Sequence, residues 1–568
     1  MLILSIWNLL FALLLALSLI NFLLGLYTLN LSSALCLNWN LFTWGSSMVD
    51  FTLLLDWVSF TFISFVLLIS GSVFYYSGEY MEGELNMPRF ILLLLAFVTS
   101  MGLLIFSPNL ISLLLGWDGL GLVSYCLVIY YQNYKSLNAG MLTVLSNRVG
   151  DVFILVTIAY MLNYGDWGLA SWLGDSPFLK LATLMIVLAS LTKSAQIPFS
   201  AWLPAAMAAP TPVSSLVHSS TLVTAGVYLV IRLGWIYDFW LNDLLMILST
   251  LTMFMAGLGA CFEFDLKKVI ALSTLSQLGL MMFSLSMGLV KMALFHLIMH
   301  ALFKALLFMS AGCIIHSSKG WQDLRLMGNC SLMIPYISSC FTVSNLALSG
   351  MPFLAGFYSK DLILEMALFQ ELNSLSILFL FLSTGLTVAY TLRLIYYVVI
   401  RNYVLSGSSN MSDGNGVMMK STLGLTFFSI IFGASISWVM VESPEIFLPI
   451  TLKNLTLVTC ITGGVLGFLI SQPSLNSKFM SFFSFSIWFS SSMWFMPYLS
   501  SQFLINSPLS KGGSWGKEGD LGWVEFYGGQ GLSKTLSSSA DSMQKLLSYG
   551  VKFYIFIFWA VVVFFVLS

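Results

Sequence analysis

Long apolar stretches, each about the length needed to cross a lipid bilayer, recur along almost the whole chain. A membrane-spanning helix requires about 20 mostly apolar residues. Only 8% of the 568 residues are charged and 58% are hydrophobic, whereas soluble domains are about 25% charged. A soluble core could not bury this much apolar surface. The sequence therefore predicts an all-α, polytopic membrane helix bundle.

We expect about 15 membrane-spanning segments. One of them, 333–370, is interrupted by Gly350-Met351-Pro352 and again at Gly356, and it is counted as one discontinuous helix. The other predicted segments are 4–27, 52–74, 88–106, 109–131, 140–163, 180–199, 211–233, 240–262, 268–289, 292–315, 376–402, 421–441, 451–471 and 550–567.

A second interruption follows the segment that ends at 199, where four prolines crowd into residues 198–212. Proline removes a backbone donor and clashes with the preceding turn. Broken helices at membrane depth are tolerated only against protein or a watery cavity, and in transporters they line binding sites. Lys193 precedes this interruption and Lys360 follows the one at 350–356. These matching features predict two inverted five-helix repeats.

The remaining segments flank these repeats. Residues 472–549 are too polar to cross a membrane, so we expect a partly helical, amphipathic segment that lies laterally along the membrane surface. The predicted parts are N-terminal flanking spans at 1–108, a first repeat at 109–235, a second repeat at 240–402, C-terminal flanking spans at 403–471, a surface loop and lateral helix at 472–549, and a C-terminal anchor span at 550–568.

Lysine and arginine gather on one side of the predicted topology. Inner loops of membrane proteins carry an excess of these residues, so this side is the inner one, and the N-terminus shares it. The even-numbered loops and their edges hold Arg89, Lys135, Lys267, Lys268, Lys319, Arg325, Arg401 and Lys420, whereas the odd-numbered ones hold Lys180, Arg232, Lys291 and Lys453.

Several ionisable side chains lie inside the apolar stretches. His296, His300 and Lys304 are spaced four apart, which places them on nearly one face of a helix over ~12 Å. His218 occupies another apolar stretch. Such groups normally face a bundle interior or a wet cavity and mark an ion path. Histidine titrates near neutral pH and both donates and accepts hydrogen bonds, so this row predicts a proton relay.

Each of these residues also has a structural interpretation. Lys193 could form a static buried ion pair that fixes helix packing, and a single histidine such as His218 is often a packing residue. Lys360 and Asp361 could cap the half-helix at the interruption. His316 lies at the end of a predicted span and receives no role.

Other patterns exclude several classes of function. The seven cysteines form no C-x-x-C pair or iron–sulfur spacing, and no glycine-rich nucleotide motif is present. Two histidines four apart could bind zinc, but no carboxylate or thiol lies nearby and Lys304 would repel a cation. The net charge of −1 argues against nucleic acid as a partner. Asp265, Lys267 and Lys268 are expected to be solvated.

Eight short runs between 88 and 400 are more specific than this general pattern. They are Gly116-Trp117-Asp118-Gly119-Leu120-Gly121, Asn147-Arg148-Val149-Gly150-Asp151, Thr192-Lys193-Ser194-Ala195-Gln196, Pro210-Thr211-Pro212-Val213-Ser214-Ser215-Leu216-Val217-His218, Asp265-Leu266-Lys267-Lys268, Ser273-Thr274-Leu275-Ser276-Gln277-Leu278-Gly279, residues 295–304, and Gly350-Met351-Pro352-Phe353-Leu354-Ala355-Gly356-Phe357-Tyr358-Ser359-Lys360-Asp361. Together they resemble the antiporter-like subunits of proton-translocating NADH:quinone oxidoreductase, respiratory complex I, which are related to Mrp-type sodium/proton antiporters. The lateral segment and C-terminal anchor resemble the chain 5 branch of that family.

The resemblance implies roles at the first interruption. Asp118 stands where the family usually has glutamate, and it is implied to be the charge partner of Lys193. Its reach is one methylene shorter, so the contact between the two is expected to need water. Arg148 and Asp151, three apart on one helix, are expected to form an intrahelical pair. That pair would either tune the Asp118–Lys193 contact or support the structure.

The same resemblance implies a proton relay with a defined order. Separating Asp118 from Lys193 would push a proton toward His218 and then through the central row. An exit station would receive it on the outer side of the membrane. The central row is His296, His300 and Lys304, and the exit station is Lys360 with Asp361.

The resemblance also implies a setting for this chain. It would be a membrane-arm subunit of NADH:ubiquinone reductase in the mitochondrial inner membrane, encoded in the mitochondrial genome. NADH, FMN, iron–sulfur clusters and ubiquinone would reside in partner subunits, with no cofactor in this chain. Its expected partners are neighbouring antiporter-like subunits along the lateral helix, and membrane lipids. The alternatives are an Mrp-type sodium/proton antiporter subunit and a structural strut with a silent channel.

Overall fold

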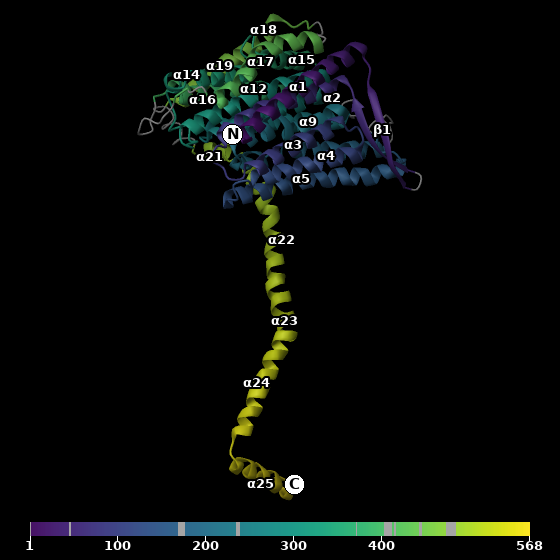
Figure 1. Cartoon of the computed structure of the whole chain (residues 1–568), viewed down its shortest axis with the longest axis vertical. Helices are drawn as coiled ribbons and strands as arrows, with labels where there is room; N and C mark the ends of the chain where they lie inside the picture. The colour runs from purple at the N-terminus through teal and green to yellow at the C-terminus, as the bar shows by residue number, and fades with distance from the viewer. Residues whose placement is uncertain are drawn as a thin grey trace. The chain divides into compact units, whose positions relative to one another are not determined.

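Apolar helices make up most of the molecule (Figure 1). The chain forms two compact units, Met1–Pro497 and Tyr498–Ser568. The computed structural model describes residues 2–44, 47–168, 177–233, 239–370, 372–402, 412–413, 416–441, 446–472 and 484–568.

The helices up to the first interruption are long and mostly regular. They are α1 (Leu2–Leu31), α2 (Trp57–Tyr80), α3 (Met87–Phe106), α4 (Leu110–Val128), α5 (Tyr134–Met161) and α6 (Pro177–Lys193). Short turns follow, namely α7 (Trp202–Ala205), the 3-10 helix η3 (Ala206–Ala208) and α8 (Thr211–Val213). The chain then continues through the π-helix η4 (Ser214–Thr221) into α9 (Leu222–Leu233).

The second half of the first unit repeats this alternation of long and broken helices. Its helices are α10 (Phe239–Phe262), α11 (Leu266–Ser286), α12 (Val290–Ser317), α13 (Cys330–Met333), α14 (Pro335–Ser349), α15 (Ala355–Phe369), α16 (Ser374–Ile395) with the π-turn η5 (Tyr396–Ile400), α17 (Val417–Met440), α18 (Ile450–Lys453), α19 (Leu455–Ser471) and α21 (Ser484–Ser491). The residues of α11 are almost all buried, and those of α12 are buried from Met292 to Ile315, so these two helices form the centre of the bundle.

The number of long spans is smaller than the sequence predicts. Twelve helices in the described residues are long and apolar enough to cross a membrane, or 13 if one bent pair counts as a span. The difference lies mainly in the interrupted segments, because α6 has 17 residues and α14 and α15 have 15 each. The sequence counted 333–370 as one span, and the structure divides it into α14 and α15, each too short to cross the membrane alone. The inverted relation of the two repeats and the six-part division stay predictions.

A β-hairpin replaces the predicted start of the second span. Strand β1 (Leu35–Trp44) pairs antiparallel with β2 (Ser47–Leu55), and Leu35 faces Leu55 in the register. The prediction that a helix begins near 52 is therefore wrong. The apolar residues of β2 run directly into those of α2, and the boundary is set by Asp56, which caps α2 in a reciprocal capping box with Ser59. The hairpin contacts α2, α3 and α4 (Figure 1).

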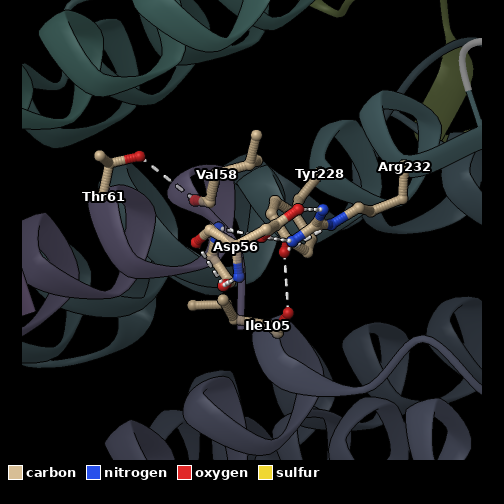
Figure 2. Close-up of polar contacts among 7 residues, drawn as sticks. Asp56, Val58, Thr61, Ile105, Tyr228 and Arg232 are labelled. Atoms are coloured by element: carbon tan, nitrogen blue, oxygen red, sulfur yellow. Dashed lines mark hydrogen bonds and ion pairs between the residues drawn. The ribbon is translucent and has the colours of Figure 1, made fainter. Parts of the chain in front are cut away.

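An ion pair fixes the hairpin end of α2 to the end of α9 (Figure 2). Arg232 donates from Nη1 and Nη2 to the two carboxylate oxygens of Asp56, at 2.5 and 2.9 Å. Its Nε donates to Tyr228 Oη at 2.8 Å, and Tyr228 Oη donates to the carbonyl of Ile105 on α3 at 2.8 Å. Burial favours a higher pKa for the Asp56 carboxyl, but the contacts with Arg232 and Ser59 outweigh it and hold this pKa below its ordinary value.

Both predicted helix interruptions are present, and each contains left-handed backbone. After α6 ends at Lys193, Ala195 has φ +54°. After α14 ends at Ser349, Gly350 has φ +86°. At the second interruption Gly356 lies against the carbonyl oxygen of Ala347, where an added Cβ would come within 1.8 Å. Only glycine fits there, so the sequence closes this interruption tightly.

The second unit is also helical. It contains the π-turn η6 (Tyr498–Gln502), α22 (Phe503–Ser514), η7 (Trp515–Val524), α23 (Glu525–Tyr527), α24 (Gly529–Ser548) and α25 (Val551–Leu567). The helical path bends by 98° between Ser548 and Val551. A polar helical segment followed by an apolar C-terminal helix matches the predicted lateral helix and anchor. Its position along a membrane surface stays a prediction, and part of the predicted loop (473–483) lies outside the described residues.

Candidate functional site

Lys193 lies at the last turn of α6, fully buried beside α4. Its ammonium Nζ donates to the backbone carbonyl of Trp117 at 2.6 Å and sits 4.0 Å from the centre of the Trp117 ring. Trp202 Nε1 in turn donates to the carbonyl of Thr192 at 3.0 Å. The interruption after α6 thus places a cation against a carbonyl and an aromatic face, with spare donors on the ammonium.

Lys193 and Asp118 form no direct ion pair in the described structure, and their pairing through water stays a prediction. Asp118 Oδ2 instead accepts from Arg148 Nη1 at 3.2 Å. The same Nη1 lies 3.3 Å from Asp151 Oδ2, so the predicted intrahelical pair is present. Arg148 therefore bridges two carboxylates, and the ammonium of Lys193 interacts electrostatically with Asp151 and, more weakly, with Asp118.

The two carboxylates line a small cavity between α4 and α5. Its polar lining consists of Asp118, Asn147, Arg148 and Asp151. One oxygen each of Asp118, Asn147 and Asp151 is buried and has no hydrogen-bond partner in the described structure. Because buried polar groups are normally hydrogen-bonded, these oxygens indicate a site for water. Water there would link the carboxylates to one another.

His218 lies on the π-helical turn η4, which follows the proline-rich interruption. The residue is 1% exposed, and neither ring nitrogen has a hydrogen-bond partner among the described residues. Its ring packs 6.2 Å from the ring of Trp202. π-turns occur frequently at functional sites. A packing role alone would leave two polar nitrogens unsatisfied, which is costly.

His296 connects the central helix to both of its neighbours. Its Nδ1 lies 2.9 Å from Ser359 Oγ on α15, and its Nε2 lies 3.2 Å from Gln277 Oε1 on α11. Ser359 directly precedes Lys360. The first member of the predicted row therefore contacts the residue next to Lys360.

His300 and Lys304 continue the row on α12, and both are fully buried. The rings of His296 and His300 are 6.4 Å apart, and neither ring nitrogen of His300 has a partner in the described structure. Lys304 Nζ donates to Ser273 Oγ at 2.5 Å. The row is thus continuous in space, but its middle member needs a further polar molecule to complete a hydrogen-bonded chain.

Lys360 lies at the second interruption, where α14 ends and α15 has begun. Its Nζ donates to Thr387 Oγ1 at 2.9 Å and to the carbonyl of Ser349, the last residue of α14, at 3.3 Å. A cation at the carbonyl end of a half-helix is favourable. The predicted Lys360–Asp361 pairing is not formed as an ion pair in the described structure. The ammonium of Lys360 therefore caps the carbonyl end of α14 and also reaches a hydroxyl, whereas the structural alternative from the sequence placed a carboxylate at the positive end of a half-helix.

Several functional partners were not predicted from the sequence. They are neutral hydroxyl and amide groups, namely Ser273, Gln277, Ser359 and Thr387, with Tyr390 Oη 3.3 Å from Ser276 Oγ nearby. The signal that could have found them is the spacing of Ser273, Ser276 and Gln277, which lie three and four residues apart on one face of an apolar helix.

Lys267 is the other correction. It was expected to be solvated, but it is 7% exposed and its Nζ donates to the carbonyl of Ala209 at 3.3 Å. Only its neighbours behave as expected, since Lys268 and Asp265 form a half-exposed ion pair at 3.1 Å. Lys267 lies on the first turn of α11, which packs against the interruption rather than against solvent.

Three family models match consecutive parts of the chain. Residues 39–91 match NADH-ubiquinone oxidoreductase (complex I) chain 5 N-terminus, 107–387 match the NADH:quinone oxidoreductase/Mrp antiporter membrane domain, and 390–568 match NADH dehydrogenase subunit 5 C-terminus. Relatives named NADH-ubiquinone oxidoreductase chain 5 are similar over most of their length. The protein from Anopheles gambiae is 52% identical over 97% of both chains, and that from Locusta migratoria is 51% identical over 96% of both chains.

Two solved structures are similar in fold. A chain of the Mrp complex from Dietzia sp. DQ12-45-1b superposes with a TM-score of 0.72 at 22% identity, over 89% of this chain and 60% of that one. A chain of an archaeal membrane-bound sulfane sulfur reductase superposes with a TM-score of 0.63 at 20% identity, over 81% of this chain and 99% of that one. At these identities the likeness concerns the fold, and it confirms an antiporter-like helix bundle.

Proposed function

The chain belongs to the NADH-ubiquinone oxidoreductase chain 5 family, and from this premise we propose that its buried lysine, histidine and aspartate side chains form a proton path. It is a multi-pass membrane subunit of the H⁺-translocating NADH:ubiquinone oxidoreductase, complex I. The insect relatives indicate a mitochondrial origin. The proposal places the chain in the inner mitochondrial membrane, and its encoding in the mitochondrial genome stays a prediction.

One observation carries the proposal. Among the described residues, buried Lys304 and Lys360 bind only hydroxyl or carbonyl oxygens, and the four ring nitrogens of buried His218 and His300 have no hydrogen-bond partner. Burying such groups without compensation is expensive. In a static bundle these unsatisfied polar groups would only lower the stability of the fold. They are useful in a path that is hydrated during turnover, because water then completes their hydrogen bonds and carries the proton from one station to the next.

We propose that Arg148 sets the state of the path at its first station. While Arg148 holds Asp118 and Asp151, Lys193 donates to the Trp117 carbonyl. A carboxylate released from Arg148 would attract and stabilise a charged Lys193, and its recapture would release the proton toward His218. This replaces a simple opening and closing of an Asp118–Lys193 pair with a competition between two cations for the same carboxylates.

The exit side of the path follows from the contacts of His296. A proton on this ring can pass to Ser359 Oγ, which adjoins Lys360, and from Lys360 to Thr387. Asp361 is proposed to attract a charged Lys360 electrostatically, because the two residues are adjacent but form no ion pair. We propose, from the family resemblance, that this exit leads to the outer side.

Redox chemistry is proposed to occur in other subunits. The sequence of this chain has no nucleotide-binding or iron–sulfur motif. NADH, FMN, iron–sulfur clusters and ubiquinone are therefore assigned to partner subunits. The specific neighbours are proposed to be other antiporter-like subunits, contacted along the polar helical segment of the second unit, together with membrane lipids.

The test replaces Lys304 with methionine in the intact complex, reconstituted in vesicles. Methionine keeps similar volume and removes the proton-carrying group. We expect proton pumping coupled to NADH oxidation to fall about tenfold or more, while the assembled complex retains its subunits. The matched control is Lys268→Met, at a half-exposed lysine paired with Asp265, which should pump normally. Full proton stoichiometry in an assembled Lys304→Met complex would mean that this chain is a strut.

A further inference from the structure

The first helix interruption contains a backbone carbonyl that the interrupted chain leaves without a donor of its own. Ala209, which is 1% exposed, ends the 3-10 helix η3, and its backbone is extended there, with ψ +158°. Two of the next three residues, Pro210 and Pro212, have no N–H group. Buried carbonyl groups are nearly always hydrogen-bonded. The carbonyl of Ala209 therefore needs a donor from another element.

Lys267 supplies this donor from the first turn of α11. Its side chain is 7% exposed, and its Nζ donates to the carbonyl oxygen of Ala209 at 3.3 Å. Hydrogen bonds from charged donors are stronger than those between neutral groups. From Ala209 the chain runs through α8 directly into η4, the π-helical turn that carries His218. Lys267 therefore holds the segment that leads into the His218 turn.

The start of α11 provides a fixed base for this contact. The backbone N–H of Leu266 donates to the carbonyl of Gln322, and that of Leu324 donates to the carbonyl of Phe264, both at 2.9 Å. Lys267 follows directly after Leu266. Farther along, α11 packs against η3 and η4 on one side and against α12 on another. An ammonium at this position can thus hold the interruption in a defined place relative to the central row.

The contacts of Lys267 differ from those of the lysines assigned to the proton path. Lys304 and Lys360 each donate to a hydroxyl group, and Lys193 interacts electrostatically with two carboxylates. In the part of the chain that the structure describes, the ammonium of Lys267 donates only to a backbone carbonyl. Hydroxyl and carboxyl groups can take up and release protons, whereas a backbone carbonyl only accepts hydrogen bonds. The surroundings of Lys267 therefore suit holding the backbone rather than passing on a proton.

We propose that Lys267 is a positioning residue, which holds the first interruption and the His218 turn in place for proton transfer without carrying a proton itself. At the second interruption, Lys360 performs both tasks, because it caps the carbonyl end of α14 and reaches a hydroxyl. At the first, the tasks are divided, since Lys193 is the station and Lys267 provides the hold. This inference rests on the proposed function, because the position of His218 matters only if it relays protons.

The experiment compares substitutions of Lys267 in the intact complex in vesicles, with pumping measured per assembled complex. Lys267→Met removes the donor, and we expect severalfold slower NADH-driven pumping. Lys267→Arg keeps a charged donor that cannot lose its proton, so we expect near-normal pumping. A proton carrier would behave differently, because arginine would stop it as methionine does. Lys268→Met, at the adjacent half-exposed lysine that pairs with Asp265, is the matched control and should pump normally.

A second measurement keeps the test decisive if Lys267→Met lowers the amount of assembled complex. Lys267→Gln keeps an N–H donor on a shorter, uncharged side chain, and we expect its pumping to lie between those of the methionine and arginine variants. A high-resolution map of the Lys267→Gln complex should show residues 209–218 displaced, while Lys304 keeps its contact with Ser273.

The inference is overturned if Lys267→Met pumps as fast per complex as Lys268→Met, because Lys267 would then only support the fold. It is also overturned if Lys267→Arg is as slow as Lys267→Met, or if residues 209–218 keep their position in Lys267→Gln. Should Lys304→Met keep full stoichiometry, the proposed function fails. If instead Lys304→Met stops pumping while Lys267→Met pumps normally, only this inference is lost.

Discussion

The two helix interruptions place a buried lysine in opposite electrostatic settings. At the first, Lys193 shares its surroundings with Arg148 and two carboxylates, so two cations are balanced by Asp118 and Asp151. At the second and in the central row, Lys360 and Lys304 are held by hydroxyl and carbonyl oxygens, and neither forms an ion pair in the described structure.

This difference separates two tasks within one chain. In a balanced cluster, a change in which cation holds which carboxylate changes how well a charged Lys193 is stabilised, so the cluster is suited to switching. A cation without a counter-charge is stable in a buried site only while water or a neighbouring charge compensates it. Such a site is suited to receiving and passing on a proton. Substitutions should therefore have different effects in the charge-balanced cluster and in the region without counter-charges.

The largest effect is expected from a fixed charge in the central row. Arginine cannot lose its proton in a protein, so Lys304→Arg should stop pumping as completely as methionine does. In addition it should impair assembly of the complex, because a permanent buried charge has no carboxylate partner there. Lys193→Arg should also stop pumping but assemble normally, since Asp118 and Asp151 can hold a second guanidinium. The measurements are proton pumping and subunit content, and equal assembly of the two variants would contradict the comparison.

Removing the bridging cation should have the next largest effect. In Arg148→Gln both carboxylates are released from the guanidinium, so Lys193 becomes fixed to one of them as a static ion pair. We expect severalfold slower NADH-driven pumping with an unchanged proton stoichiometry per electron pair, because the switch is slowed rather than bypassed. Lys420→Gln, on a residue outside the cluster, serves as control. Unchanged pumping in Arg148→Gln would show that the pair is only structural support.

A smaller effect is expected from lengthening the first carboxylate. Asp118→Glu extends its reach by one methylene toward Lys193, at a place where the cavity between α4 and α5 has room. We expect pumping within about twofold of the unchanged chain, with a shift of the carboxylate contact from Arg148 to Lys193 that a high-resolution map can show. Asp118→Asn should instead slow pumping strongly. If Asp118→Glu slowed pumping as much as Asp118→Asn, the length of the side chain would not be what limits the contact with Lys193.

The smallest effect on pumping is expected at the clamp between α2 and α9. Because the folded-state pKa of Asp56 is lowered, its carboxylate stabilises the fold above its unfolded pKa, and this contribution is lost as the pH falls through the folded pKa. Asp56→Asn removes the carboxylate partner of Arg232 and should cost about 3 kcal/mol near neutral pH. Thermal dissociation of the complex, measured against pH, should show a difference that shrinks below about pH 4. A difference that does not change with pH would mean that the charge of Asp56 does not stabilise the clamp.

The sequence predicted the features that depend on residue type and spacing. The row at 296, 300 and 304, the two interruptions and the Arg148–Asp151 pair all follow from helical periodicity or from proline and glycine. The hairpin at 35–55 was missed, because the apolar strand β2 continues without a polar gap into α2 and only Asp56 marks the boundary.

The partners of the charged groups could not be predicted from spacing. Lys193 and Trp117 are 76 positions apart, and His296 and Ser359 are 63 apart, so their contacts depend on how separate helices pack. Lys267 looked like a loop residue because charged neighbours surround it. Its burial follows from the packing of α11 against the proline-rich interruption, which no local pattern reveals.

The central claim is that hydration joins the unpaired ring nitrogens of His218 and His300 to their neighbouring stations. A high-resolution map of the whole complex during turnover tests this most directly. The account predicts ordered water within hydrogen-bonding distance of His300, between His296 and Lys304, and of His218. A map that shows tight apolar packing around both rings in every state of the turnover cycle would contradict it.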